Sequence, residues 1–152
     1  MFFPILQDKL KIQPGDANAV RRYNFTIPPF FQAKAVVIAP HMHLLGRQIN
    51  VELASADNKT TTPMIFIDDW DFNWQGFYTW TEPISLPSGA TIKLTCSFDN
   101  TTNNPKNPNN PLKLVDWGEG TQDEMCVAFI GVTFDNESLV KSFLPFQKKQ
   151  TK

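Results

Sequence analysis

The chain is built from short segments in which apolar and polar residues alternate, and no segment of useful length repeats its apolar residues at the helical period. Alternation places every second side chain on one face of a strand, so each segment predicts a half-buried β-strand. Clear cases lie at 23–27, 49–53 and 92–98. Turn-forming residues separate the segments at intervals of roughly 8–12 residues, as in sandwich folds. The sequence therefore predicts an all-β fold, a single antiparallel β-sandwich domain of the jelly-roll type.

Length and charge limit what such a domain can do. The chain has 152 residues, of which 41% are apolar, and this is enough for one buried core. We expect residues 1–146 to form the domain and residues 147–152 to be a charged tail. The net charge of −1 gives no electrostatic basis for nucleic-acid binding. No stretch approaches the roughly 20 apolar residues of a membrane span.

The chain's only two histidines, His41 and His43, lie two positions apart. They follow an apolar run at 35–39 that predicts a buried strand. If this strand continues through the motif, both imidazoles project from one face, as two ligands of one metal ion must. The spacing alone is a weak metal signal. Two surface or core-edge histidines in a turn would give the same pattern.

The two cysteines fall in two apolar rows. Cys96 belongs to the alternating row within 92–98, and Cys126 belongs to the row within 126–134. Both side chains are therefore expected to face the core. This arrangement is compatible with a disulfide and also with two buried free thiols, because cysteine often serves as a small apolar core residue.

The same alternation turns Met125 away from the core, among the polar residues 122–124. A thioether combined with imidazole favours copper, Cu(I) above all. His41, His43 and Met125 would then form a three-ligand site with one open position. The alternative is that Met125 only fills a gap in the packing, as methionine usually does.

Two further segments attract attention. In the segment 68–75, aromatic residues alternate with polar ones; the aromatic residues are Trp70, Phe72 and Trp74. They are candidates for the wall of a substrate pocket, and the alternative is that they are ordinary core between the sheets.

The segment 100–111 holds six Asn and three Pro. We expect it to be a mobile loop that can be shortened at little cost in stability, because it has no apolar anchors.

Four motifs stand in a fixed order along the chain: His-Met-His-Leu-Leu-Gly-Arg at 41–47, Asp-Phe-Asn-Trp-Gln at 71–75, Trp-Gly-Glu-Gly-Thr at 117–121 and Asp-Glu-Met-Cys at 123–126. In this order they resemble the C-terminal domain of the copper type II, ascorbate-dependent monooxygenases. The first two motifs look closer to the dopamine β-hydroxylase branch than to the peptidylglycine α-hydroxylating branch. The resemblance covers about residues 35–134.

The resemblance implies a jelly-roll domain whose copper activates O2 for hydroxylation of a C–H bond in a small organic substrate. Carried over residue by residue, the copper ligands are His41, His43 and Met125, and Cys126 is bridged to Cys96. A disulfide implies an extracytoplasmic location, secreted, periplasmic or in a vesicle lumen. The family also has a preceding domain with a second copper, held by three histidines, through which ascorbate supplies electrons. This chain has no further histidine for that second site.

One departure bears on the substrate. The peptide-hydroxylating branch binds the substrate carboxylate with an Arg two residues before the first ligand and a Tyr four residues after the Met. Here these positions are Ala39 and Phe129, so a carboxylate clamp is not expected.

Two hypotheses follow. The leading one is the copper-binding, O2-activating domain of a monooxygenase. The other is a non-catalytic copper-binding or interaction module that retains the fold and the metal site.

Overall fold

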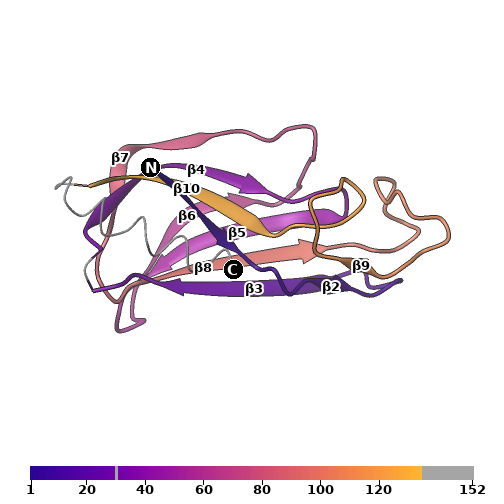
Figure 1. Cartoon of the computed structure of the whole chain (residues 1–152), viewed down its shortest axis with the longest axis horizontal. Helices are drawn as coiled ribbons and strands as arrows, with labels where there is room; N and C mark the ends of the chain where they lie inside the picture. Colours follow the sequence, from indigo (N-terminus) through magenta and orange to yellow (C-terminus); the bar gives the residue numbers. More distant parts are fainter. Residues whose placement is uncertain (30, 135–152) are drawn as a thin grey trace.

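The computed structural model describes residues 1–29 and 31–134 (Figure 1). The end of the expected domain at residue 146 and the charged tail lie outside these residues. The described chain contains strands and loops and no helix, so it has no helix that could cross a membrane. The strands are β1 (Phe2–Leu6), β2 (Lys11–Ile12), β3 (Ala19–Thr26), β4 (Ala33–His41), β5 (Gly46–Ala54), β6 (Thr61–Ile67), β7 (Tyr78–Leu86), β8 (Thr91–Phe98), β9 (Val115–Asp116) and β10 (Val127–Phe134).

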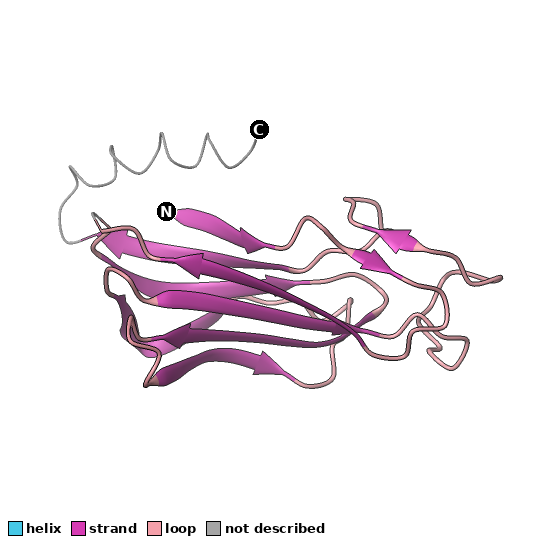
Figure 2. Ribbon diagram, turned by 90° about the horizontal axis from the view of Figure 1, so that it is seen from below, coloured by secondary structure: helices cyan, strands magenta, loops and turns pink. Residues whose placement is uncertain are grey.

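The strands form two main antiparallel sheets that lie one over the other (Figure 2). Sheet I has the order β1-β10-β4-β7, and sheet II has the order β3-β8-β5-β6. The short strands β2 and β9 pair separately. The predicted all-β antiparallel sandwich is confirmed, while its finer assignment as a jelly roll remains a prediction.

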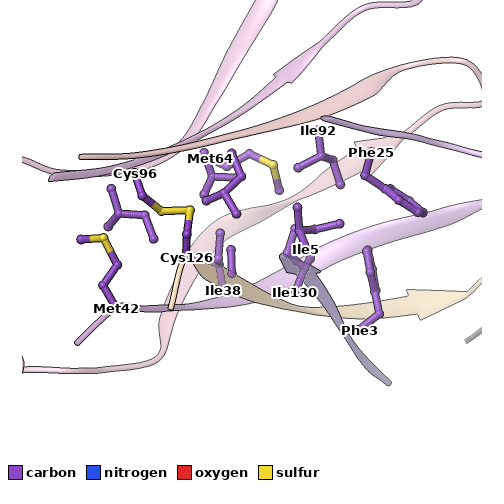
Figure 3. Packing of buried hydrophobic residues seen from close by; sticks show 14 of the residues in the cluster. Phe3, Ile5, Phe25, Ile38, Met42, Met64, Ile92, Cys96, Cys126 and Ile130 are labelled. Carbon is purple, nitrogen blue, oxygen red and sulfur yellow. A yellow bond between two sulfur atoms is a disulfide. The ribbon is translucent and has the colours of Figure 1, made fainter. Parts of the chain in front are cut away.

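The core lies between sheets I and II (Figure 3). The alternating row of β8 is fully buried, as its sequence predicts. Its members are Ile92, Leu94, Cys96 and Phe98. From sheet I, Ile38 of β4 and Ile130 of β10 point into the same layer. Each fully buried aliphatic side chain of this kind contributes about 1.5–3 kcal/mol through its removal from water.

The register of sheet I determines where the histidine motif lies. His41, the last residue of β4, pairs with Val127, the first residue of β10. The segment that follows His41 and the segment that precedes Val127 therefore meet at the same end of the sheet. This juxtaposition brings two motifs together that lie some eighty residues apart in the chain.

Candidate metal centre

The two histidines lie at the point where β4 ends and a buried turn begins. β4 ends at His41. The strand therefore does not continue to His43, although the two-residue spacing places both imidazoles on one face only in a continuous strand. Met42 is fully buried, and His43 is 4% exposed. The two imidazole rings still meet, with centroids 5.0 Å apart and planes at 81°. The chain thus brings both rings to one place although only His41 belongs to a strand.

The His41 ring is oriented by Gln75. Its Nδ1 lies 2.5 Å from Gln75 Oε1, and Gln75 Nε2 donates to the Phe72 carbonyl at 2.7 Å. Because the amide nitrogen is committed to Phe72, the amide oxygen faces the ring and can only accept. Nδ1 of His41 is therefore the nitrogen that donates to Gln75, and Nε2 is the nitrogen that a metal ion would use. A histidine that ligates a metal through one nitrogen commonly donates its other N–H to such an acceptor.

The His43 ring is oriented in the same way by a backbone carbonyl. Its Nδ1 donates to the Asp123 carbonyl at 3.0 Å. Burial lowers the pKa of His43, and the nearby His41 lowers it further, while the Asp123 carbonyl opposes the shift. The ring of Phe72 covers His43 edge-on, with centroids 5.8 Å apart. The environment therefore favours the neutral imidazole, the form that binds a metal ion.

Met125 lies in the segment that leads into β10 and is partly exposed. Its neighbour Cys126 is fully buried. As predicted, Cys126 therefore lies in the core and Met125 lies closer to the solvent.

Cys126 is joined to Cys96 of β8 by a disulfide with a Cα–Cα distance of 5.9 Å. The bridge confirms the predicted pairing. On the chain-entropy model, closing a loop across 30 residues stabilises the fold by about 3–4 kcal/mol.

Glu124 ties the Met125 segment to the histidine turn, and sequence reasoning missed it. The side chain is fully buried. Its carboxylate accepts hydrogen bonds from the backbone N–H groups of His43 at 2.9 Å, Leu45 at 2.6 Å and Met125 at 3.1 Å. Burial raises the pKa of Glu124 to about 7, although these hydrogen bonds act in the opposite direction. The sequence gave no sign of this burial, because Glu124 follows two other polar residues, Gln122 and Asp123, as in an exposed loop.

Trp70 supports the histidine turn from the other side. Its indole Nε1 donates to the His43 carbonyl at 3.1 Å, and the side chain is only 2% exposed. The indole packs directly on Gly46, where a Cβ atom would lie 2.8 Å from Trp70 Cδ1. Lys106, from the Asn-rich loop, donates to the Trp70 carbonyl at 2.8 Å. The glycine of the histidine motif is thus required by the close approach of the tryptophan.

The three aromatic residues proposed as a pocket wall do not share a face. The segment between β6 and β7 is a loop and not a strand, so its alternation does not sort side chains onto two sides. Trp70 is buried under the histidine turn, Phe72 lies beside His43, and Trp74 is 80% exposed. The expectation that alternation aligns all three was therefore wrong.

A shallow hollow lies beside His41 instead. It has a volume of about 180 Å³ and is lined by Ala39, Pro40, His41, Gln75, Gly76, Phe77 and Phe129. Ala39 and Phe129 are direct cross-strand partners in β4 and β10. Phe77 is 74% exposed and Phe129 is 38% exposed, so the hollow has an apolar rim open to solvent. Sequence reasoning named Ala39 and Phe129 only as departures from a family pattern.

The donor set fits a soft metal ion better than a hard one. Two imidazoles, each held through Nδ1, stand next to a segment that carries a thioether, a combination suited to copper. Among residues 1–29 and 31–134, no group of three or more His, Cys, Asp or Glu side chains could hold a metal ion. A site that uses methionine as its third ligand does not depend on such a group.

Comparison with known proteins agrees with this geometry. No curated protein matches the chain. The family described as copper type II ascorbate-dependent monooxygenase, C-terminal domain, matches residues 29–138, which include all four motifs and both cysteines. The match covers well over half of the 152 residues. The chain therefore belongs to the family of copper type II ascorbate-dependent monooxygenase C-terminal domains.

Proposed function

We propose that this chain is the copper-binding, O2-activating domain of an ascorbate-dependent monooxygenase that hydroxylates C–H bonds. His41, His43 and Met125 would hold the ion. When bound, copper supplies the one-electron redox chemistry by which O2 attacks an otherwise unreactive C–H bond. The observation that carries the proposal is the pair of imidazoles 5.0 Å apart, each with its Nδ1 bonded to an oxygen acceptor.

The residues of the chain prepare the site in four ways. Gln75 and the Asp123 carbonyl fix the tautomers of the two rings, so no ring has to rotate before it binds. The burial of His43 keeps its ring neutral. The Phe72 ring lies against His43 and limits the access of water on that side. The thioether of Met125 would add the soft ligand that favours Cu(I).

Met125→Ile tests the ligand set. We expect the substitution to lower the affinity for Cu(I) much more than the affinity for Cu(II), because sulfur is the soft partner and isoleucine has no donor. His41→Ala and His43→Ala should weaken both oxidation states. X-ray absorption of the Cu(I) form should detect one sulfur scatterer in the unsubstituted chain and none in Met125→Ile. An unsubstituted chain that binds Cu(I) without sulfur would be evidence against the ligand set.

We further propose that the substrate presents an uncharged group to the hollow beside His41. Ala39, Phe77 and Phe129 offer no charged side chain there, and Ala39 and Phe129 occupy the positions at which the peptide-hydroxylating branch carries its Arg and Tyr. An apolar hollow favours an uncharged ligand because a carboxylate would lose hydration without gaining a partner.

Two small probes of equal shape test this preference. Cyclohexylmethanol and cyclohexanecarboxylate can each be titrated into the isotope-labelled chain. We expect the alcohol to shift the backbone resonances of Ala39 and Phe129 and the carboxylate to leave them unchanged. Stronger shifts with the carboxylate would contradict the proposal.

A complete reaction also needs a source of electrons. We propose that a second, N-terminal copper domain receives electrons from ascorbate, since this chain has only the two histidines of its own site. The disulfide Cys96–Cys126 supports an extracytoplasmic location for the protein.

The same shortage of histidines favours the second candidate, a non-catalytic copper-binding module. Product formation separates the two candidates. The protein in its native length should consume O2 and ascorbate and release a hydroxylated product if it is an enzyme. If it binds copper but never turns over, the chain is a binding module.

A further inference from the structure

Glu124 differs from the other acidic residues of the described chain in its burial and in its partners. It is fully buried. Within residues 1–29 and 31–134, no Lys, Arg or His side chain forms an ion pair with it, whereas Asp99 pairs with Arg47 and Asp57 pairs with Lys59. Removing a carboxylate from water without a counter-ion is costly unless several hydrogen bonds replace its hydration. Its partners are therefore central to its role.

The Glu124 side chain accepts hydrogen bonds from backbone N–H groups of the candidate metal centre. Oε2 accepts from His43 and from Met125, and Oε1 accepts from Leu45. The amides of one histidine ligand and of the methionine ligand thus meet at a single oxygen atom. Because these donors belong to the main chain, the carboxylate fixes the path of the chain at both ligands.

The backbone of Glu124 is itself anchored on the side away from the histidines. Its N–H donates to the Asp116 carbonyl at 3.1 Å, and its carbonyl accepts from the Gly118 N–H at 3.2 Å. Asp116 belongs to β9, which pairs with β2. The glutamate therefore connects a fixed edge of the fold to the histidine turn.

From this geometry, and on the basis of the function proposed above, we infer that Glu124 is a positioning residue that holds Met125 at bonding distance from a metal ion on His41 and His43. Glu124 fixes the main chain at His43 and Met125 together. The folded chain would therefore hold the Met125 sulfur ready to bind the ion, and this sulfur would give the site its preference for Cu(I). Without the carboxylate, the Met125 segment would keep its attachments through Cys126 and through the Asp123 and Glu124 backbone, but it would lose the direct link between the amides of Met125 and His43.

Glu124→Gln tests this role at almost constant size. A glutamine offers one acceptor oxygen to three N–H donors, and its own NH2 group must face at least one of them. Loss of an outer-shell partner typically lowers metal affinity about 10–100-fold. We expect a loss of this size for Cu(I), a much smaller loss for Cu(II), and a weakened or missing sulfur scatterer in the X-ray absorption of the Cu(I) form.

Two companion variants make the result specific. Glu119→Gln removes an exposed carboxylate from the same loop and should leave both affinities unchanged. In a Met125→Ile background, Glu124→Gln should cause little further loss of Cu(I) affinity, because the ligand that it positions is already absent. A folded Glu124→Gln chain that retains its Cu(I) affinity and its sulfur scatterer would overturn the inference. Equal losses for Cu(I) and Cu(II) would also overturn it, since they would indicate a general loss of structure.

If Glu124→Gln does not fold, hydrogen exchange in the unsubstituted chain provides the test. The amides of His43, Leu45 and Met125 should show one common protection factor, that is, one free energy of opening, because one carboxylate holds all three. Clearly different protection factors for the three amides would contradict the inference. Failure of the proposed function has a different signature, namely an unsubstituted chain whose Cu(I) form lacks sulfur coordination.

Discussion

Two loops support the candidate metal centre, and they do so by opposite means. The loop at 100–111 is almost entirely polar, yet the Asn100 side chain is fully buried and donates to the carbonyls of Ile12, Gln13 and Lys113. The loop at 68–77 is rich in aromatic residues, yet Trp74 and Phe77 are largely exposed and only Trp70 is deeply buried. The polar loop is therefore held at many points, and the aromatic loop depends mainly on one side chain.

This difference shows that the amino-acid composition of a loop does not decide how firmly the loop is held to the rest of the fold. A side-chain amide can be buried where backbone carbonyls accept hydrogen bonds from its NH2 group. A tryptophan side chain stays on the surface where the fold provides no space for it in the core. The two loops are also connected, through the hydrogen bond from Lys106 to the Trp70 carbonyl. Substitutions in each loop can test whether the distinction holds.

The largest effect should come from Asn100→Ala. The substitution leaves the carbonyls of Ile12, Gln13 and Lys113 without this donor. A buried polar group that loses its partner costs about 1–3 kcal/mol, so we expect the free energy of unfolding, measured in urea, to fall by about 3 kcal/mol. Asn103→Ala, at an exposed position of the same loop, should change it by less than about 0.5 kcal/mol. Equal effects at both positions would mean that Asn100 does not anchor the loop.

An intermediate effect should come from Trp70→Phe. The substitution removes the hydrogen bond to the His43 carbonyl and part of the packing against Gly46. We expect a loss of about 2 kcal/mol in unfolding free energy, together with weaker copper binding, because the histidine turn loses its support. Trp74→Phe should alter neither quantity, since that indole is exposed. If the two variants behave alike, the aromatic loop is not held by Trp70.

The smallest expected effect concerns the attachment of glycans. The chain has four Asn-x-Ser/Thr sequons, at Asn24, Asn58, Asn100 and Asn136. Asn24 and Asn58 are exposed, whereas Asn100 is buried with its side-chain nitrogen fully engaged. Expressed through a eukaryotic secretory pathway, the chain should carry glycans at Asn24 and Asn58 and none at Asn100. Mass spectrometry of tryptic peptides gives the occupancy directly. A glycan at Asn100 would show that the loop closes only after modification. The further sequon at Asn136 lies outside the described residues.

The fold was largely predictable from the sequence because period-two patterns depend only on neighbouring residues. The buried row of β8 and the opposite orientations of Met125 and Cys126 both follow from alternation. The aromatic alternation at 68–75 misled for the same reason, since alternation sorts side chains only where the chain is extended. The expectation of a mobile Asn-rich loop considered only apolar anchors and missed the polar ones, because the donors of Asn100 find carbonyls far away in the sequence. The mobility of the loop and the cost of shortening it remain predictions.

The candidate site was predictable only in its ligands. His41, His43 and Met125 were found by spacing, residue chemistry and family resemblance, and their role as ligands remains a proposal. Glu124, Gln75 and Trp70 were missed as supporting residues because their function arises from long-range contacts. Glu124, for example, is separated by 81 residues from His43 and by 79 from Leu45. No local pattern in the sequence reports such a contact.

The disulfide has a consequence for the order in which the protein matures. Cys126 is the immediate neighbour of Met125, and in the reduced chain its thiol would compete with the thioether for Cu(I), which binds thiolates strongly. Oxidation to the Cys96–Cys126 bridge withdraws this sulfur into the core and removes the competitor. After oxidation neither cysteine is available as a thiolate, so Met125 no longer competes with a neighbouring thiol. If copper is bound as proposed above, the bridge should therefore form before the metal ion is delivered.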